Sequence, residues 1–158
     1  MKYMKKWIAI LVLAVMLANV ALAIAEPMNT IWQMQDIINE ILDSSAQEGV
    51  QEVCMYLEDQ KAFAIGIESD IIAQTAAGAA IGKGTEYWNA FKAYIYKLYE
   101  NIRELLDIFG HDKQGLYVIL RGKNNGEWFG YYMLGDNGDG IIEVEDVVTH
   151  DTKPVQTK

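Results

Sequence analysis

The sequence predicts an α+β domain in which a three-stranded antiparallel meander forms a single sheet packed on one long amphipathic helix. Helix-like and strand-like hydrophobic patterns occur in separate blocks along the chain. Residues 87–109 keep a helical apolar period over about six turns. The last third alternates apolar and polar residues in runs separated by Gly, Asn and Asp. The predicted order is a helix, a β-hairpin, a short Ala-rich helix, the long helix and a three-stranded antiparallel meander.

The first 25 residues predict a signal peptide. Lys2, Lys5 and Lys6 form a basic start, an apolar run follows over 7–22, and residues 23–25 (AIA) fit a cleavage site. An uncleaved leader of this length is close to the minimum for a membrane anchor. We therefore expect a secreted or cell-envelope protein with one domain over 26–148 and a polar, disordered tail over 149–158.

The chain is acidic, with 13 basic and 22 acidic residues and a net charge of −9. The charged residues of the leader are all basic, so its removal makes the remaining chain still more acidic. Such a surface repels phosphate backbones and anionic lipid headgroups, which argues against nucleic-acid and membrane-surface binding. Membrane association is expected only through an uncleaved leader. Cys54 is the single cysteine, so an intramolecular disulfide is excluded and the core must hold the domain.

The first helix is predicted over 31–43, because Thr30 and Gln33 have the spacing of a capping box before an apolar helical pattern. Residues 50–57 and 62–68 alternate and predict a hairpin. Cys54 lies in the middle of the first of these strands, where a small residue beside the core is expected. No nucleophile–base pair is apparent around it.

The Ala-rich stretch 70–84 predicts a short helix followed by a glycine loop. The long helix begins at Thr85 and is ended by Gly110. Arg103 and Asp107 are spaced as an ion pair on its solvent side. His111 and His150 follow predicted elements at opposite ends of the meander, where we expect exposed loop histidines rather than ligands of one metal.

The meander is predicted from strands at 116–121, 127–134 and 141–148, with a turn at 123–126. In that register Arg121 lies across from Trp128, and Tyr117 across from Tyr132. One face then forms the core and carries Leu116, Val118, Leu120, Phe129, Tyr131, Met133, Ile142 and Val144. The opposite face mixes aromatic, aliphatic and charged residues: Tyr117, Ile119, Arg121, Trp128, Tyr132, Glu143, Glu145 and Val147.

This mixed composition fits neither a solvent face nor a core face. The predicted binding residues on it are Tyr117, Arg121, Trp128, Tyr132, Glu143 and Glu145. Three occupants stay open: the first helix with Trp32 and Met34, a protein partner or second copy of the chain, and a small ligand.

The loop 135–140 and the residues after it partly match an EF-hand calcium loop. Placing Gly140 at position 6 assigns Asn137, Asp139, Glu143 and Asp146 to ligand positions. Position 1 then falls on Gly135, which has no side chain, and the preceding residues alternate like a strand. A hairpin loop explains the same residues. Calcium is the one cofactor considered, through these four residues.

The predicted function is that of an exported, small, acidic, non-catalytic binding or interaction protein. A calcium-binding module is one alternative. A hydrolase of unknown class is the other, and no catalytic residue is assigned to it.

Overall fold

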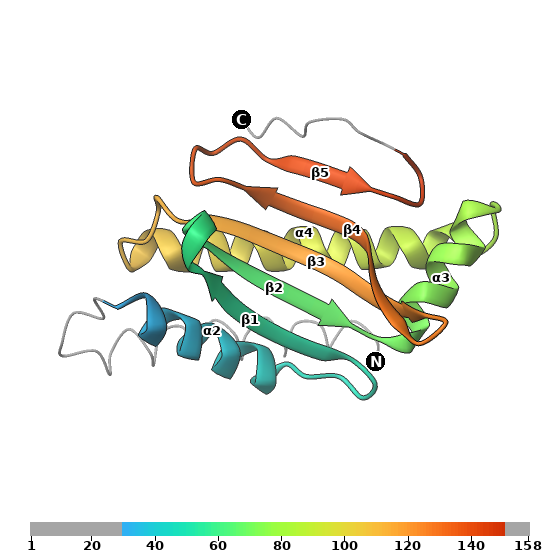
Figure 1. The fold of residues 1–158 in the computed structure, drawn as a ribbon, viewed down its shortest axis with the longest axis horizontal. Coiled ribbons are helices and arrows are strands. Elements are labelled where there is room, and N and C mark those ends of the chain that lie inside the picture. Colours follow the sequence, from blue (N-terminus) through green and yellow to red (C-terminus); the bar gives the residue numbers. More distant parts are fainter. Residues whose placement is uncertain (1–29, 151–158) are drawn as a thin grey trace, which may run out of the picture.

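A five-stranded mixed sheet organises residues 30–150, the part of the chain described by the computed structural model. The strands β1 (Gln51–Leu57), β2 (Ala62–Glu68), β3 (Gly115–Asn124), β4 (Glu127–Asp136) and β5 (Glu143–Asp146) lie side by side in that order (Figure 1). The helices are α2 (Ile31–Ser44), α3 (Asp70–Ala80) and α4 (Thr85–Ile108), with a short 3-10 helix, η1 (Glu58–Gln60), between β1 and β2. The predicted α+β class is confirmed. The predicted signal peptide (1–25) and residues 151–158 of the predicted tail lie outside the described residues.

The predicted hairpin and the predicted meander belong to one sheet. Strands β1 and β2 pair antiparallel, as do β3 with β4 and β4 with β5. Strands β2 and β3 pair parallel, with α3 and α4 forming the connection between them. Parallel neighbours require such a long crossover.

The helix ends follow from local sequence. Thr30 and Gln33 form the capping box at the start of α2, as predicted. Gly110 follows α4 with φ 76°, and the amide of His111 donates to the carbonyl of Leu106 at 2.7 Å. The Gly110 amide also donates to the carbonyl of Asp107, which completes a Schellman motif. No helix within residues 30–150 is long and apolar enough to cross a membrane.

The core lies between the sheet and α4, which runs behind the strands in Figure 1. The largest fully buried side chains include Trp88, Ile95 and Leu106 of α4, and Phe63, Ile65 and Leu116 of the sheet. Helix α2 contributes Met34, Ile38 and Leu42 to this core while lying along the outer edge of β1. Of the three occupants considered for the mixed face, the first helix is therefore ruled out.

The predicted register of β3 and β4 is also wrong. The turn is the pair Asn125-Gly126, both with positive φ, so Trp128 pairs with Lys123 rather than with Arg121. A bulge in the ladder at Leu120/Arg121 then inserts an extra residue into β4. Beyond this bulge Tyr132 pairs with Leu120, and Tyr117 pairs with Gly135.

The bulge exchanges the faces of the residues that follow it. Tyr132 points toward the core and is 8% exposed, whereas the sequence places it on the mixed face. Met133 pairs with Ile119 on the mixed face rather than in the predicted core. Phe129 precedes the bulge and pairs with Gly122 on the predicted face, but it is 45% exposed rather than part of the core.

Two polar residues predicted at the surface instead pack against the sheet, Arg103 partly buried and His111 buried. Arg103 forms an ion pair with Asp136 of β4 at 2.6 Å, and not with Asp107. His111 is 9% exposed and packs against the ring of Phe63, because the Schellman turn after α4 directs the chain back toward the sheet. Periodicity along one helix does not show contacts that the crossover to β3 creates.

Candidate functional site on the open face of the sheet

One face of the sheet is turned away from α4, and the described helices leave it uncovered (Figure 1). We call it the open face. Its central positions follow from the strand pairings as two rows that cross all five strands. One row is Val53, Gly66, Ile119, Met133 and Glu145, and the next is Met55, Ala64, Tyr117, Gly135 and Glu143.

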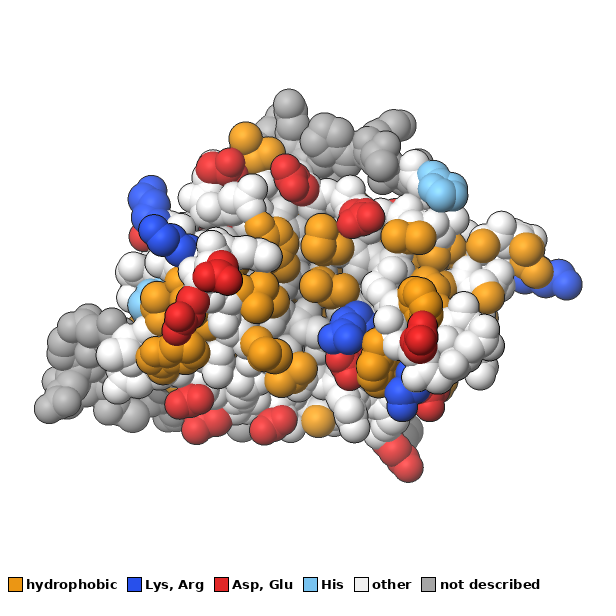
Figure 2. Space-filling model, viewed as in Figure 1, with side chains coloured by type: hydrophobic (Ala, Val, Ile, Leu, Met, Phe, Trp, Pro, Cys, Tyr) orange, Lys and Arg blue, Asp and Glu red, His pale blue; other side chains and the backbone are white. Residues whose placement is uncertain are grey.

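The apolar side chains of the open face extend to its edge. On the edge strand β1, Val53 is 43% exposed and Met55 is 57% exposed. Figure 2 shows hydrophobic side chains spread across the front of the sheet, with acidic side chains mainly around its margin. A soluble domain rarely leaves such a contiguous apolar surface without a partner for it.

A shallow hollow of about 360 Å³ lies on the open face where Gly130 leaves a side-chain position empty. Its lining includes Ile119 and Met133, with Arg121 and Glu145 contributing charges of opposite sign. A Cβ atom on Gly130 would stand 3.5 Å from the Ile119 side chain, so a larger residue would fill the hollow. The hollow therefore offers an apolar floor with one basic and one acidic group on its lining.

Trp128 forms the aromatic part of this surface. Its ring lies 4.9 Å from the Lys123 ammonium and 5.7 Å from the Arg121 guanidinium, both measured to the ring centroid. Arg121 also pairs with Glu68 of β2 at 2.9 Å. These contacts hold the indole and the guanidinium in place, which limits the entropy lost when either group meets a partner.

Tyr117 lies on the open face but leans toward β4. Its ring covers Gly135, where a Cβ atom would clash with it, and its hydroxyl donates to the Asn137 side chain. Burial raises the pKa of Tyr117, and the nearby charges of Glu143, Asp136 and Asp139 raise it further. The phenol therefore remains a hydrogen-bond donor at neutral pH.

Five of the six predicted binding residues share the open face: Tyr117, Arg121, Trp128, Glu143 and Glu145. Tyr132 does not, because it faces α4 and lies near Lys92. The sequence did not single out Val53, Met55 or Met133. The first two join this surface only through the parallel pairing of β2 with β3, and Met133 joins it only through the bulge.

The predicted calcium ligands are dispersed or already engaged. Asn137 accepts from Tyr117, and Asp139 accepts from the amide of Ile141 at 2.9 Å. Glu143 lies on the open face. Asp146 lies on the opposite face and pairs with Lys92 at 3.0 Å. Within residues 30–150 no group of three or more His, Cys, Asp or Glu side chains is placed to hold a metal ion.

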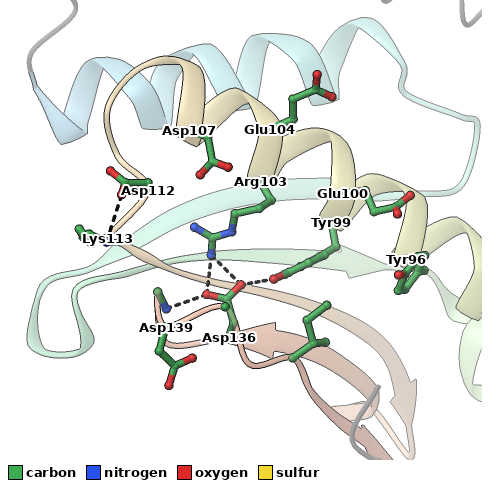
Figure 3. A pocket seen from close by; sticks show the side chains of 13 residues that line it. Tyr96, Tyr99, Glu100, Arg103, Glu104, Asp107, Asp112, Lys113, Asp136 and Asp139 are labelled. Carbon is green, nitrogen blue, oxygen red and sulfur yellow. Dashed lines mark hydrogen bonds and ion pairs between the residues drawn. The ribbon is translucent and has the colours of Figure 1, made fainter. Parts of the chain in front are cut away.

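The loop between β4 and β5 is held by Asp136 instead. The carboxylate of Asp136 accepts hydrogen bonds from Arg103, from the Tyr99 hydroxyl and from the amide of Gly138 (Figure 3). An acidic hollow of about 530 Å³ opens beside this cluster and is lined by Glu100, Glu104, Asp107 and Asp139, among others. The buried contacts explain the position of the loop without a bound ion.

Cys54 is 1% exposed, and burial raises the pKa of its thiol to about 12. The thiolate is the nucleophilic form of cysteine, so this environment suppresses its reactivity. Cys54 therefore contributes to the core, as predicted, and provides no support for a hydrolase.

No protein-family model, curated protein or solved structure matches this chain. Function has to be inferred from the chain's own surfaces. Among these, the open face combines exposed apolar side chains with fixed aromatic and charged groups.

Proposed function

We propose that this protein is an exported, non-catalytic interaction protein that binds a protein partner through the open face. The observation that carries the proposal is the exposure of Val53 and Met55, 43% and 57%, on the edge strand β1 of an uncovered sheet face. Burying apolar surface contributes roughly 25 cal/mol per Å². When a partner covers the open face, burial of its apolar side chains stabilises the complex. In the unbound protein the same side chains remain in contact with water.

The composition of the open face supports a protein partner. Tryptophan, tyrosine, methionine and arginine are enriched at protein interfaces, and Trp128, Tyr117, Met133 and Arg121 all lie here. The Arg121–Glu68 pair and the exposed Glu143 and Glu145 supply charges around the apolar centre. This arrangement of an apolar centre with charged surroundings resembles that of specific interfaces.

Export is the part of the proposal that rests on the leader sequence. The basic start, the apolar run and the small residues before Glu26 support cleavage near residue 25. The N-terminal sequence of the protein purified from the cell envelope or medium tests this directly. A native N-terminus at Met1 in a cytosolic fraction would contradict export.

Site-specific photo-crosslinking tests the open face. A benzophenone amino acid at position 55, on the full chain in its native cells, should yield a defined adduct with a partner. The matched control is position 108, because Ile108 is 67% exposed but lies on α4. Trp128→Ala should reduce the adduct at position 55 by about tenfold, the loss expected for an interface anchor.

The absence of an adduct at position 55, or equal adducts at positions 55 and 108, would contradict a partner on the open face. The mass of the adduct separates two kinds of occupant. Twice the mass of the chain identifies a second copy, and any other mass identifies a different protein.

A further inference from the structure

A further cavity lies on the side of the sheet opposite the open face, between β1 and α4. It has a volume of about 290 Å³. Val50, Glu52 and Ile67 line it from the sheet side, and Tyr87, Phe91 and Tyr94 line it from α4. Glu52 pairs with Ile67 on the core face, so this cavity is separate from the open face.

Glu52 carries one carboxylate oxygen that no described residue satisfies. Its Oε1 atom accepts from the Tyr94 hydroxyl at 2.5 Å. Its Oε2 atom is buried and has no hydrogen-bond partner within the described part of the chain. A carboxylate with one buried, unpaired oxygen and no cation beside it is costly, and partial burial accordingly raises the pKa of Glu52.

Asp146 shows how the same fold satisfies a comparable carboxylate. Glu52 and Asp146 lie at the two ends of one row of paired residues on the core face. The row consists of Glu52, Ile67, Leu120, Tyr132 and Asp146. Helix α4 supplies Lys92 to Asp146 at 3.0 Å, and Thr149 adds two hydrogen bonds. At Glu52 the same helix supplies only a phenol, so the cationic partner is missing from this end of the row.

The walls of the cavity suit an organic cation. Tyr87, Phe91 and Tyr94 follow one side of α4 at helical spacing and present aromatic rings beside Glu52. Tyr87 is 66% exposed, which places it at the entrance. Aromatic faces attract ammonium groups, and a carboxylate adds a charged hydrogen-bond acceptor.

We propose that this cavity binds a small primary amine with an apolar body, whose ammonium group pairs with the carboxylate of Glu52. The apolar body packs between Ile67 and Phe91. Charge decides between ligand classes here. An ammonium ion neutralises the buried carboxylate, an alcohol supplies only one neutral hydrogen bond, and a carboxylic acid brings a second negative charge.

Calorimetry on the purified chain with three matched probes tests the charge requirement. The probes are 2-phenylethylamine, 2-phenylethanol and 3-phenylpropanoate at neutral pH. The amine should bind saturably, and its affinity should exceed that of the alcohol by about tenfold, as expected for a charge-assisted bond. Equal affinity for amine and alcohol, or no saturable binding of the amine, would overturn the proposal.

Variants locate the site. Glu52→Gln keeps the shape of the side chain and should weaken amine binding by about tenfold. Ala90→Phe should block the cavity from an exposed position on α4, so it tests the site without altering the core. Glu127→Gln removes an exposed carboxylate at the start of β4, outside the lining of the cavity, and should leave amine binding unchanged. Unchanged amine affinity in both Glu52→Gln and Ala90→Phe would place binding elsewhere and refute the proposal.

Discussion

At the scale of single residues, the contact between Arg103 and Asp136 determines how the sheet and α4 meet. The side chain of Arg103 is 17% exposed and that of Asp136 is 1% exposed. Arg103 also donates to the carbonyl of Gln114 at 2.9 Å, so it joins α4 to both the start of β3 and the end of β4. Such a buried pair contributes little net stability over an apolar pair, but removal of one partner leaves an uncompensated charge.

We therefore predict that Arg103→Met lowers the free energy of unfolding by about 3 kcal/mol in urea titrations. The double variant Arg103→Met with Asp136→Leu should recover only part of this loss, because neither charge remains but the Tyr99 hydroxyl and the Gly138 amide lose their acceptor. Lys97→Met is the control, since the Lys97–Glu100 pair is exposed and should change the same quantity by less than about 1 kcal/mol. A single variant as stable as the wild type would show that Asp136 does not depend on Arg103.

At the scale of elements, α2 protects the free edge of the sheet. Strand β1 lies at the edge, and its outward backbone groups would otherwise be free to pair with another chain. The Asn39 side chain accepts from the amide of Cys54 at 2.8 Å and donates to the carbonyl of the same residue at 3.0 Å. Gln35 accepts from the amide of Tyr56 at 2.7 Å. Two helix side chains thus replace the missing neighbouring strand.

Asn39→Ala should lower the free energy of unfolding by about 1–2 kcal/mol, because the backbone groups of Cys54 lose their partners in a partly buried site. This loss should exceed the small gain in helix propensity from alanine. Chemical denaturation measures the loss, and thioflavin fluorescence on prolonged incubation reports pairing of exposed edges. Glu40→Ala changes the neighbouring exposed residue and should affect neither measurement.

At the scale of the whole molecule, the sequence predicts elements better than it predicts their partners. The capping box at Thr30 and the stop at Gly110 depend on residues a few positions apart, and both are confirmed. The parallel pairing of β2 with β3 depends on how α3 and α4 fold back, which no local pattern encodes.

In the candidate site too, local patterns predict some residues correctly, whereas residues that depend on strand pairing are misplaced. The predicted pairing of β3 with β4 near the turn differs from the observed pairing by two residues. Trp128 therefore stays on its predicted face, because the side chains of a strand return to the same face every two residues. The bulge beyond Arg121 adds one residue and moves Tyr132 to the other face. Alternation in β4 could not reveal this bulge, because aromatic residues occur on both of its faces. The contacts of Arg103 and His111 with the sheet were missed because they depend on the crossover from α4 to β3.

The row that crosses the core face predicts how the stability of the whole molecule depends on pH. Burial raises the pKa of Glu52 above 4.5, so over the interval above that value the folded state keeps a proton that the unfolded chain loses. The free energy of unfolding should therefore fall as pH rises from about 4.5 through the folded pKa of Glu52.

Asp146 has the opposite effect at the other end of the row. Burial alone would raise the pKa of Asp146, but hydrogen bonds from Thr149 and the contact with Lys92 lower it below 3.8. Its contribution is present above about pH 3.8 and is lost as pH falls through its folded pKa. Together the two acids predict a stability maximum in mildly acidic solution, with losses toward both lower and neutral pH.

Glu52→Gln should remove the fall in the free energy of unfolding that the wild type shows as pH rises toward neutrality. Urea titrations at intervals from about pH 4 to pH 7 measure this free energy for both proteins. The variant should be more stable than the wild type near neutral pH, and this difference should shrink as the pH approaches 4.5. Glu145→Gln is the control for removing one carboxylate from an acidic molecule, since that side chain is exposed on the open face. Parallel pH profiles for the wild type and Glu52→Gln would show that Glu52 titrates alike in the folded and unfolded chains.

A saturating primary amine should raise the stability of the wild type near neutral pH and leave that of Glu52→Gln unchanged. This result would link the stability loss to an unfilled cavity.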